Sequence, residues 1–146
     1  MPDETLLAFD YGTQFIGVAV GNTLTGHARP LEVFANSTRE ARFARIEQLL
    51  GEWQPSRLVV GLALDADGGE QPMTALCRRF ANQLQGRYGL PVELVDERGT
   101  SLAAQSEMGA AGRGLRVDAV AAAIILQSYF DARPPAMSRP PPGEQR

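Results

Sequence analysis

The chain has 146 residues, with 14 basic and 17 acidic side chains and a formal net charge of −3, and every basic residue is an arginine. This length suits one domain, and the single cysteine, Cys77, excludes an internally disulfide-bonded secreted fold. The longest apolar run, Ala119–Leu126, is far shorter than the ~20 residues that cross a bilayer, and the acidic start at Met1–Glu4 does not resemble a signal peptide, so we do not expect a membrane protein.

The first part of the chain predicts three strands joined by short turns. The apolar segment Thr5–Asp10 predicts a strand that ends in an acid, and Phe15–Gly21 predicts a second strand whose glycines allow another backbone to approach closely. After the turn residues Asn22–Gly26, a third and shorter strand is predicted around Pro30–Phe34. Short turns between consecutive strands favour an antiparallel meander.

A helical period follows. Ser37 and Glu40 form a capping-box signature at the expected helix start. Apolar residues then follow at the spacing of one helical face, at Phe43, Ile46, Leu50 and Trp53. Pro55 ends this helix, and the continuous apolar segment Arg57–Leu62 predicts a strand buried on both faces.

The second half of the chain alternates helices and strands. After a glycine-containing loop at Asp65–Glu70, a helix is predicted from Pro72. Its expected buried residues are Met73, Leu76, Phe80 and Leu84, with Cys77 as a small buried hydrophobe. A strand is predicted over Pro91–Val95, a short helix over Thr100–Met108, and a last helix over Asp118–Ala132.

This order of elements predicts an α/β fold with one mixed five-stranded sheet. Three strands form the antiparallel meander, two are parallel, and helices cover both faces. We assign residues 1–132 to this domain and residues 133–146 to a proline-rich disordered tail, since half of the ten prolines lie between Pro134 and Pro142. A ligand for a proline-recognition domain is the alternative interpretation of the tail.

Three acids stand where strands end or helices start. Asp10 ends the first strand, Glu97 follows the last strand, and Asp118 begins the final helix. Such positions converge on one side of an open sheet, and carboxylates gathered there repel one another unless a cation lies between them. Oxygen ligands without His or Cys favour Mg²⁺ or Mn²⁺, and two such ions can activate a water for phosphodiester hydrolysis.

Each acid also has a purely structural interpretation. Asp10 can shape the turn that follows it, Glu97 can pair with Arg98 or Arg79, and Asp118 can be a helix N-cap. We favour the shared site because all three acids are placed alike.

Four motifs in order give this chain a resemblance that no single motif would give. They are the segments 9–21 (FDYGTQFIGVAVG), 59–62 (VVGL) with Asp67-Gly68, 96–101 (DERGTS) and 118–127 (DAVAAAIILQ). The chain resembles a bacterial family of RuvC-related, RNase H-like proteins called Holliday junction resolvases and pre-16S ribosomal RNA nucleases. The resemblance implies an RNase H-like fold, Mg²⁺-dependent nuclease chemistry in the cytoplasm, and metal-binding catalytic acids at Asp10, Glu97 and Asp118.

The resemblance also implies contacts with nucleic acid, and the chain departs from the family at two places. Phe15 stands where the family usually has an arginine before Ile-Gly, and arginines replace the lysines that commonly precede the last motif. We predict contacts with the nucleic-acid backbone from Gly12 and Thr13 and from the arginines Arg98, Arg113 and Arg116, although solvated arginines are the alternative.

The strand order raises a question about the third acid. If the strand ending at Gly61 lies beside the first strand, the strand of Glu97 is two places away, roughly 10 Å at ~4.8 Å per strand. Asp96 or Asp67 is then the alternative ligand.

The predicted function is metal-dependent cleavage of structured RNA, with maturation of the pre-16S RNA 5′ end as the implied reaction and precursor ribosomal particles as partners. Three alternatives stay open: a resolvase of branched DNA, a non-catalytic ribosome-assembly protein that binds nucleic acid, and an actin-like ATP-binding module. The last needs a second domain that 146 residues do not hold. A monomer or weak homodimer is expected, since only symmetric junction cutting requires a dimer.

Overall fold

The structure is a computed structural model that describes residues 4–65, 67–96 and 116–132, apart from the side chain of Arg116. Within these ranges five strands form one mixed sheet in the order β3-β2-β1-β4-β5. The strands are β1 (Thr5–Tyr11), β2 (Phe15–Asn22), β3 (His27–Ala35), β4 (Arg57–Leu62) and β5 (Val92–Asp96). β1, β2 and β3 pair antiparallel, whereas β4 pairs parallel with both β1 and β5. The predicted meander with two added parallel strands is confirmed.

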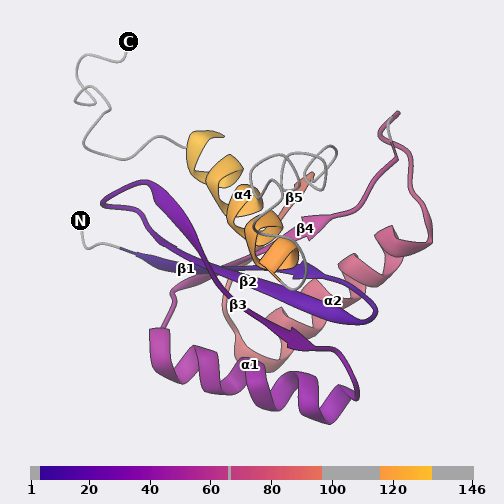
Figure 1. Ribbon diagram of the computed structural model, residues 1–146, viewed down its shortest axis with the longest axis horizontal. Coiled ribbons are helices and arrows are strands. Elements are labelled where there is room, and N and C mark those ends of the chain that lie inside the picture. The colour runs from indigo at the N-terminus through magenta and orange to yellow at the C-terminus, as the bar shows by residue number, and fades with distance from the viewer. Residues whose placement is uncertain (1–3, 66, 97–115, 133–146) are drawn as a thin grey trace.

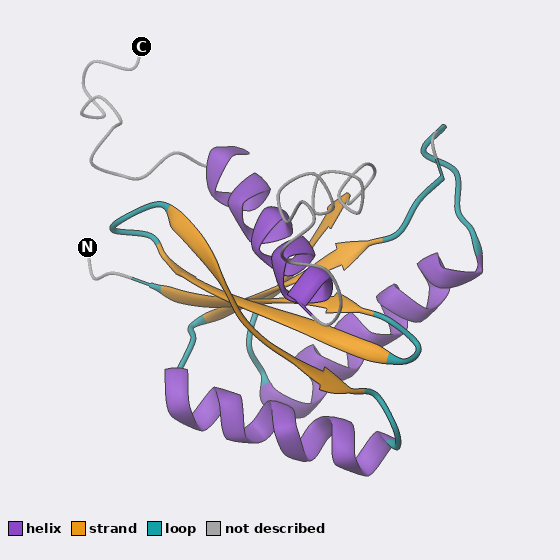
Figure 2. Ribbon diagram, viewed as in Figure 1, coloured by secondary structure: helices purple, strands orange, loops and turns teal. Residues whose placement is uncertain are grey.

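Helices cover both faces of this sheet (Figure 1, Figure 2). α1 (Arg39–Trp53) and α2 (Pro72–Tyr88) lie on one face, and α4 (Arg116–Ala132) lies across the other. Alternate residues of β1 pack into the cores on the two faces of the sheet. Leu7 and Phe9 belong to the core under α1 and α2, whereas Leu6 and Ala8 belong to the core under α4.

The core under α1 and α2 is built around aromatic contacts. Phe80 of α2 meets the ring of Phe9 edge-on at 5.8 Å and the ring of Tyr11 at 4.7 Å. The helical side chains buried against the strands are Phe43, Ile46 and Leu49 of α1 and Phe80, Ala81 and Leu84 of α2. The core under α4 uses smaller residues, and alanines such as Ala8 and Ala122 let that helix lie close to the sheet.

The third strand differs from its prediction. It runs from His27 to Ala35, so it is longer than β1 or β2 rather than shorter. Tight closure of the preceding turn, in which the Gly26 amide donates to the Asn22 carbonyl, lets pairing start at once. Pro30 does not interrupt the strand because β3 is an edge strand and the pairing shifts register nearby, between Val18 and Ala19.

The helix boundaries and buried faces also differ in detail. Thr38, not Ser37, caps α1, because its side-chain oxygen accepts a bond from the Ala41 amide. In α2 the fully buried positions include Thr74 and Cys77, while the predicted Met73 and Leu76 are only partly buried. The Thr74 hydroxyl donates to the Ala63 carbonyl, which explains why a polar residue takes the inner position.

Several predictions fall outside the described residues. These are the short helix over 100–108 and the tail over 133–146. Among the helices of the described ranges, none combines the length and apolar content that crossing a membrane requires.

Candidate active site

Asp10 lies near the carboxyl end of β1, on the face of the sheet that α4 covers. Its face follows from strand alternation, since Leu6 and Ala8 of the same strand pack under α4. The residue is half-buried, and its partner in the neighbouring strand β2 is Gly17. Asp10 is therefore held on the rigid central strand, with no side chain from β2 beside it.

Gly17 brings the first turn of α4 to the same place. A Cβ at position 17 would lie 2.0 Å from the carbonyl oxygen of Asp118 and 2.8 Å from the amide nitrogen of Ala119. Only a glycine permits this approach, because real side chains do not tolerate such distances. Asp10 is the strand partner of Gly17, and paired residues in antiparallel strands are ~4.5–5.5 Å apart at Cα. Asp10 and the backbone of Asp118 therefore both lie next to Gly17.

Asp118 sits in the first turn of α4, which begins at Arg116. The helix that was predicted to start at about Asp118 thus includes two residues before it, and the alternative role of Asp118 as the N-cap is wrong. Burial raises the pKa of its carboxyl above the ordinary value, because desolvation disfavours the charged form. A cation beside Asp118 would offset that penalty.

β4 contributes no side chain on the other flank of Asp10. Phe9 is in register with Val60, so the next residue of β4, Gly61, lies beside Asp10. Gly61 is on the face that α4 covers, because Val59, two positions earlier in β4, packs under α4. Asp10 thus lies between Gly17 and Gly61, and the backbone of Asp118 comes next to Gly17.

The predicted third acid is not among the described residues. Glu97, Arg98 and Arg113 lie outside the described ranges, and only the backbone of Arg116 is described. β4 does separate β5 from β1, as the predicted 10 Å gap requires. Within residues 4–65, 67–96 and 116–132, no three Asp, Glu, His or Cys side chains gather as a metal site would need.

The two alternative ligands lie away from Asp10. Val95 packs under α4, so alternation places its neighbour Asp96 on the opposite face of β5. Asp67 is exposed in the loop between β4 and α2, where its amide donates to the Asp65 carboxylate at 3.0 Å. Neither position favours a ligand beside Asp118.

The turn between β1 and β2 carries the predicted contacts Gly12 and Thr13. Thr13 is exposed, and the Gly12 carbonyl accepts a bond of 2.8 Å from the side-chain amide of Asn36. The side-chain oxygen of Asn36 in turn accepts a bond of 2.7 Å from Nε of Arg42. The sequence did not predict these two hydrogen bonds of Asn36, because no local pattern joins a loop asparagine to a turn 24 positions earlier.

Phe15, the departure from the family pattern, is the first residue of β2, and its side chain is 37% exposed. It therefore occupies a surface position next to the turn.

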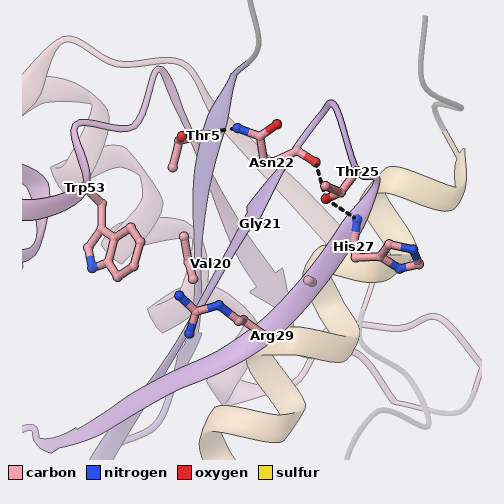
Figure 3. Close-up of a pocket in the computed structure, with 9 residues that line it drawn as sticks. Thr5, Val20, Gly21, Asn22, Thr25, His27, Arg29 and Trp53 are labelled. Atoms are coloured by element: carbon pink, nitrogen blue, oxygen red, sulfur yellow. Dashed lines mark hydrogen bonds between the residues drawn. The ribbon is translucent and has the colours of Figure 1, made fainter. Parts of the chain in front are cut away.

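A separate cavity of about 420 Å³ lies at the other end of β1 and β2 (Figure 3). Arg29 lies 5.4 Å above the ring of Trp53 there, and His27 belongs to the same lining. Thr5, at the start of β1, also lines it. Asp10 lies five positions after Thr5, roughly 16 Å along the strand, so this cavity does not belong to the acid pair.

The residues that are described suit a hard divalent cation. Asp10 and Asp118 supply carboxylate oxygens, the ligands that Mg²⁺ and Mn²⁺ prefer, and burial raises the pKa of Asp118, a cost that a bound cation would offset. Both could hold such an ion, with a further ligand coming from elsewhere.

Comparison with known proteins identifies the family of this chain. The RuvX family, described as "Holliday junction resolvase", matches residues 4–132. This chain belongs to that family. The relative from Bordetella petrii is 67% identical over 134 residues, covering 92% of this chain and all of its own, and is called "Putative pre-16S rRNA nuclease". A relative from Cupriavidus necator with the same name is 55% identical and covers 90% of this chain and 92% of its own.

Two solved structures share the fold of this RuvX family member. RuvC of Thermus thermophilus in complex with a Holliday junction substrate has a TM-score of 0.56 at 20% identity and covers 88% of this chain and 95% of its own. The fowlpox virus Holliday junction resolvase has a TM-score of 0.56 at 11% identity and covers 88% and 99%. At these identities the likeness establishes the RuvC-like, RNase H-like fold.

Proposed function

We propose that this protein is an endonuclease that hydrolyses phosphodiester bonds with Mg²⁺ or Mn²⁺ and acts in maturation of the pre-16S rRNA 5′ end. The observation that carries the proposal is the contact between Gly17 and Asp118, which sets Asp118 beside Asp10. Relatives at 67% and 55% identity that are named for the same reaction support the choice of substrate. The reaction would take place in the cytoplasm, on precursor ribosomal particles.

The two described acids come from two different elements of the fold, β1 and α4. Asp10 is anchored in the central strand, and the backbone of Asp118 approaches the same place from α4, so two rigid elements would hold the two acids. We assign Glu97 as the third ligand. When bound there, one or two divalent ions would activate a water and stabilise the leaving oxygen.

The chain's own residues would also hold the substrate. We assign backbone contacts to Gly12 and Thr13 in the exposed turn next to Asp10, and to the arginines Arg98, Arg113 and Arg116. Arginine suits this role because its planar guanidinium can bind a phosphate through two parallel hydrogen bonds.

Cleavage of a precursor RNA tests the site. Purified protein with Mn²⁺ should cut RNA that spans the pre-16S 5′ end, and Asp10→Asn or Asp118→Asn should slow cutting roughly 100-fold or more, as removal of one preorganised electrostatic contact does. Asp131→Asn is the matched control, because it removes a carboxylate from the other end of the same helix. Unchanged cutting by Asp10→Asn would refute the assignment.

Metal binding can be tested without turnover. Mn²⁺ at about 100 times its dissociation constant should stabilise the wild type by ~2.7 kcal/mol, and this gain should shrink in Asp10→Asn. If Mn²⁺ perturbs no NMR signals near Asp10 and Asp118, the nuclease proposal is rejected in favour of a non-catalytic ribosome-assembly protein that binds nucleic acid.

Branched DNA is the second candidate substrate. The family description and the two resolvase structures favour it. Symmetric cutting of a four-way junction needs two active sites related by a twofold axis, so it predicts a dimer in sedimentation. A monomer that cuts precursor RNA and leaves junctions intact would exclude this candidate.

A further inference from the structure

A second charged feature lies on the opposite face of the sheet, in the cleft between α1 and α2. The cleft encloses about 210 Å³, and its lining includes Arg39 and Arg42 of α1 and Arg79 of α2. None of the described residues that line it carries a carboxylate. Tyr11 and Phe80, whose rings are 4.7 Å apart, also line it. The cleft therefore has aromatic walls and three cationic side chains.

One of these arginines is held in place before any ligand arrives. Nε of Arg42 donates to the Asn36 side chain at 2.7 Å, and the guanidinium lies 5.6 Å above the ring of Tyr11. Because the hydrogen bond uses Nε, it does not consume the two terminal nitrogens. A pre-positioned guanidinium loses less conformational freedom when it binds an anion.

The three cations are not neutralised within the described part of the chain. Ion pairs there involve Arg45, Arg57 and Arg78, and none joins a carboxylate to Arg39, Arg42 or Arg79. Arg78 is the informative contrast, since it neighbours Arg79 in sequence and pairs with Glu70 at 2.8 Å. Like charges that share one cleft repel, and an anion between them removes that cost.

The cleft lies next to the acid pair along the chain. Tyr11 follows Asp10 directly in β1, and consecutive strand residues point to opposite faces. The same Asn36 that holds Arg42 also holds the Gly12 carbonyl. A strand of nucleic acid that leaves the acid pair around this end of the sheet would therefore meet Arg42.

We propose that the cleft of Arg39, Arg42 and Arg79 binds a backbone phosphate of the polynucleotide substrate, remote from the bond that is cut. The choice of a polynucleotide rests on the proposed function. The shared chemistry is a phosphate group, which a free phosphate or a mononucleotide also carries, so the experiment separates these sources.

Binding measured without cleavage tests the cleft. A fluorescein-labelled RNA hairpin with a single-stranded 5′ extension is titrated with the full chain in EDTA, at several salt concentrations. Arg79→Gln should weaken binding about 3- to 10-fold and reduce the slope of log K against log salt by roughly 0.7 to 0.9, the value for one lost phosphate contact. Arg78→Gln, which removes the same charge from the next position, should leave the slope unchanged. Arg39→Gln should behave like Arg79→Gln.

The opposite outcomes overturn the inference. Equal slopes for Arg79→Gln and Arg78→Gln would show that only overall charge matters. Arg79-dependent binding of inorganic phosphate or AMP in calorimetry, with RNA binding unchanged, would assign the cleft to a small ligand instead. The two proposals also separate: Arg79-dependent RNA binding without any Mn²⁺-dependent cutting refutes the nuclease and leaves the cleft standing.

Discussion

Gly17 and Asp118 are in backbone contact where α4 crosses β2, and a Cβ on Gly17 would meet the Asp118 carbonyl oxygen at 2.0 Å. The absence of a side chain at Gly17 thus allows the first turn of α4, a segment far away in the sequence, to lie directly on the sheet. Since Asp10 is the strand partner of Gly17, this contact also governs the distance between the two acids.

Gly17→Ala should therefore damage both stability and the acid pair. The new methyl group would force α4 away from the sheet, at a cost of ~2–4 kcal/mol in the free energy of unfolding, at or above the usual range for overpacking. Urea denaturation measures this. Gly51→Ala is the matched control, because nothing lies within 4 Å of a Cβ there, and alanine in α1 should add ~0.5–1 kcal/mol. Equal stabilities for the two variants would contradict the contact.

Asp118→Asn should change how stability depends on pH. Burial raises the pKa of Asp118 in the folded state, so between its ordinary value near 3.8 and the raised value the native chain binds more protons than the unfolded chain. Stability from this group is then present at low pH and lost as pH rises through the folded pKa. In metal-free buffer at pH 7 the asparagine variant should be at least as stable as the wild type. A clear loss of stability there would show that the carboxylate has a compensating partner.

Asn36→Ala should loosen the turn that follows Asp10. The variant loses the bond to the Gly12 carbonyl at 2.8 Å and the bond from Arg42 at 2.7 Å, and we expect a cost of ~1–2 kcal/mol. Hydrogen exchange of the turn amides should also accelerate. Asn82→Ala, at an exposed position of α2, should be neutral or slightly stabilising. If both variants unfold at the same urea concentration, the two hydrogen bonds of Asn36 do not stabilise the fold.

Thr38→Ala tests the observed start of α1. Its side-chain oxygen accepts the Ala41 amide at 3.0 Å, so removal should cost about 1 kcal/mol, the usual value for an N-cap. Ser37→Ala should have little effect, because Ser37 precedes the cap. The reverse order of the two effects in thermal unfolding would support the capping box predicted from the sequence.

Local patterns in the sequence predicted most of the fold. The apolar run at Arg57–Leu62 indicated a doubly buried strand, and the structure buries four of its six residues. The helix of Phe43 and Ile46 was equally clear from its period. These signals are visible because a strand or helix depends on residues only a few positions apart. Boundaries were less well predicted: the cap moved from Ser37 to Thr38, since either residue can accept the same kind of bond.

The sequence by itself determined that Asp10 lies at the end of the first strand, although β1 continues for one more residue to Tyr11. It also determined that the sheet is mixed and that α4 is apolar enough to be buried. Only the tertiary structure decided that Asp118 meets Gly17, that its carboxyl loses water, and that Arg42 and Arg79 share a cleft with Tyr11. The reason is physical. Strand and helix formation follow from neighbours along the chain, whereas these contacts depend on strand register and helix packing between segments far apart in sequence, which no local pattern records.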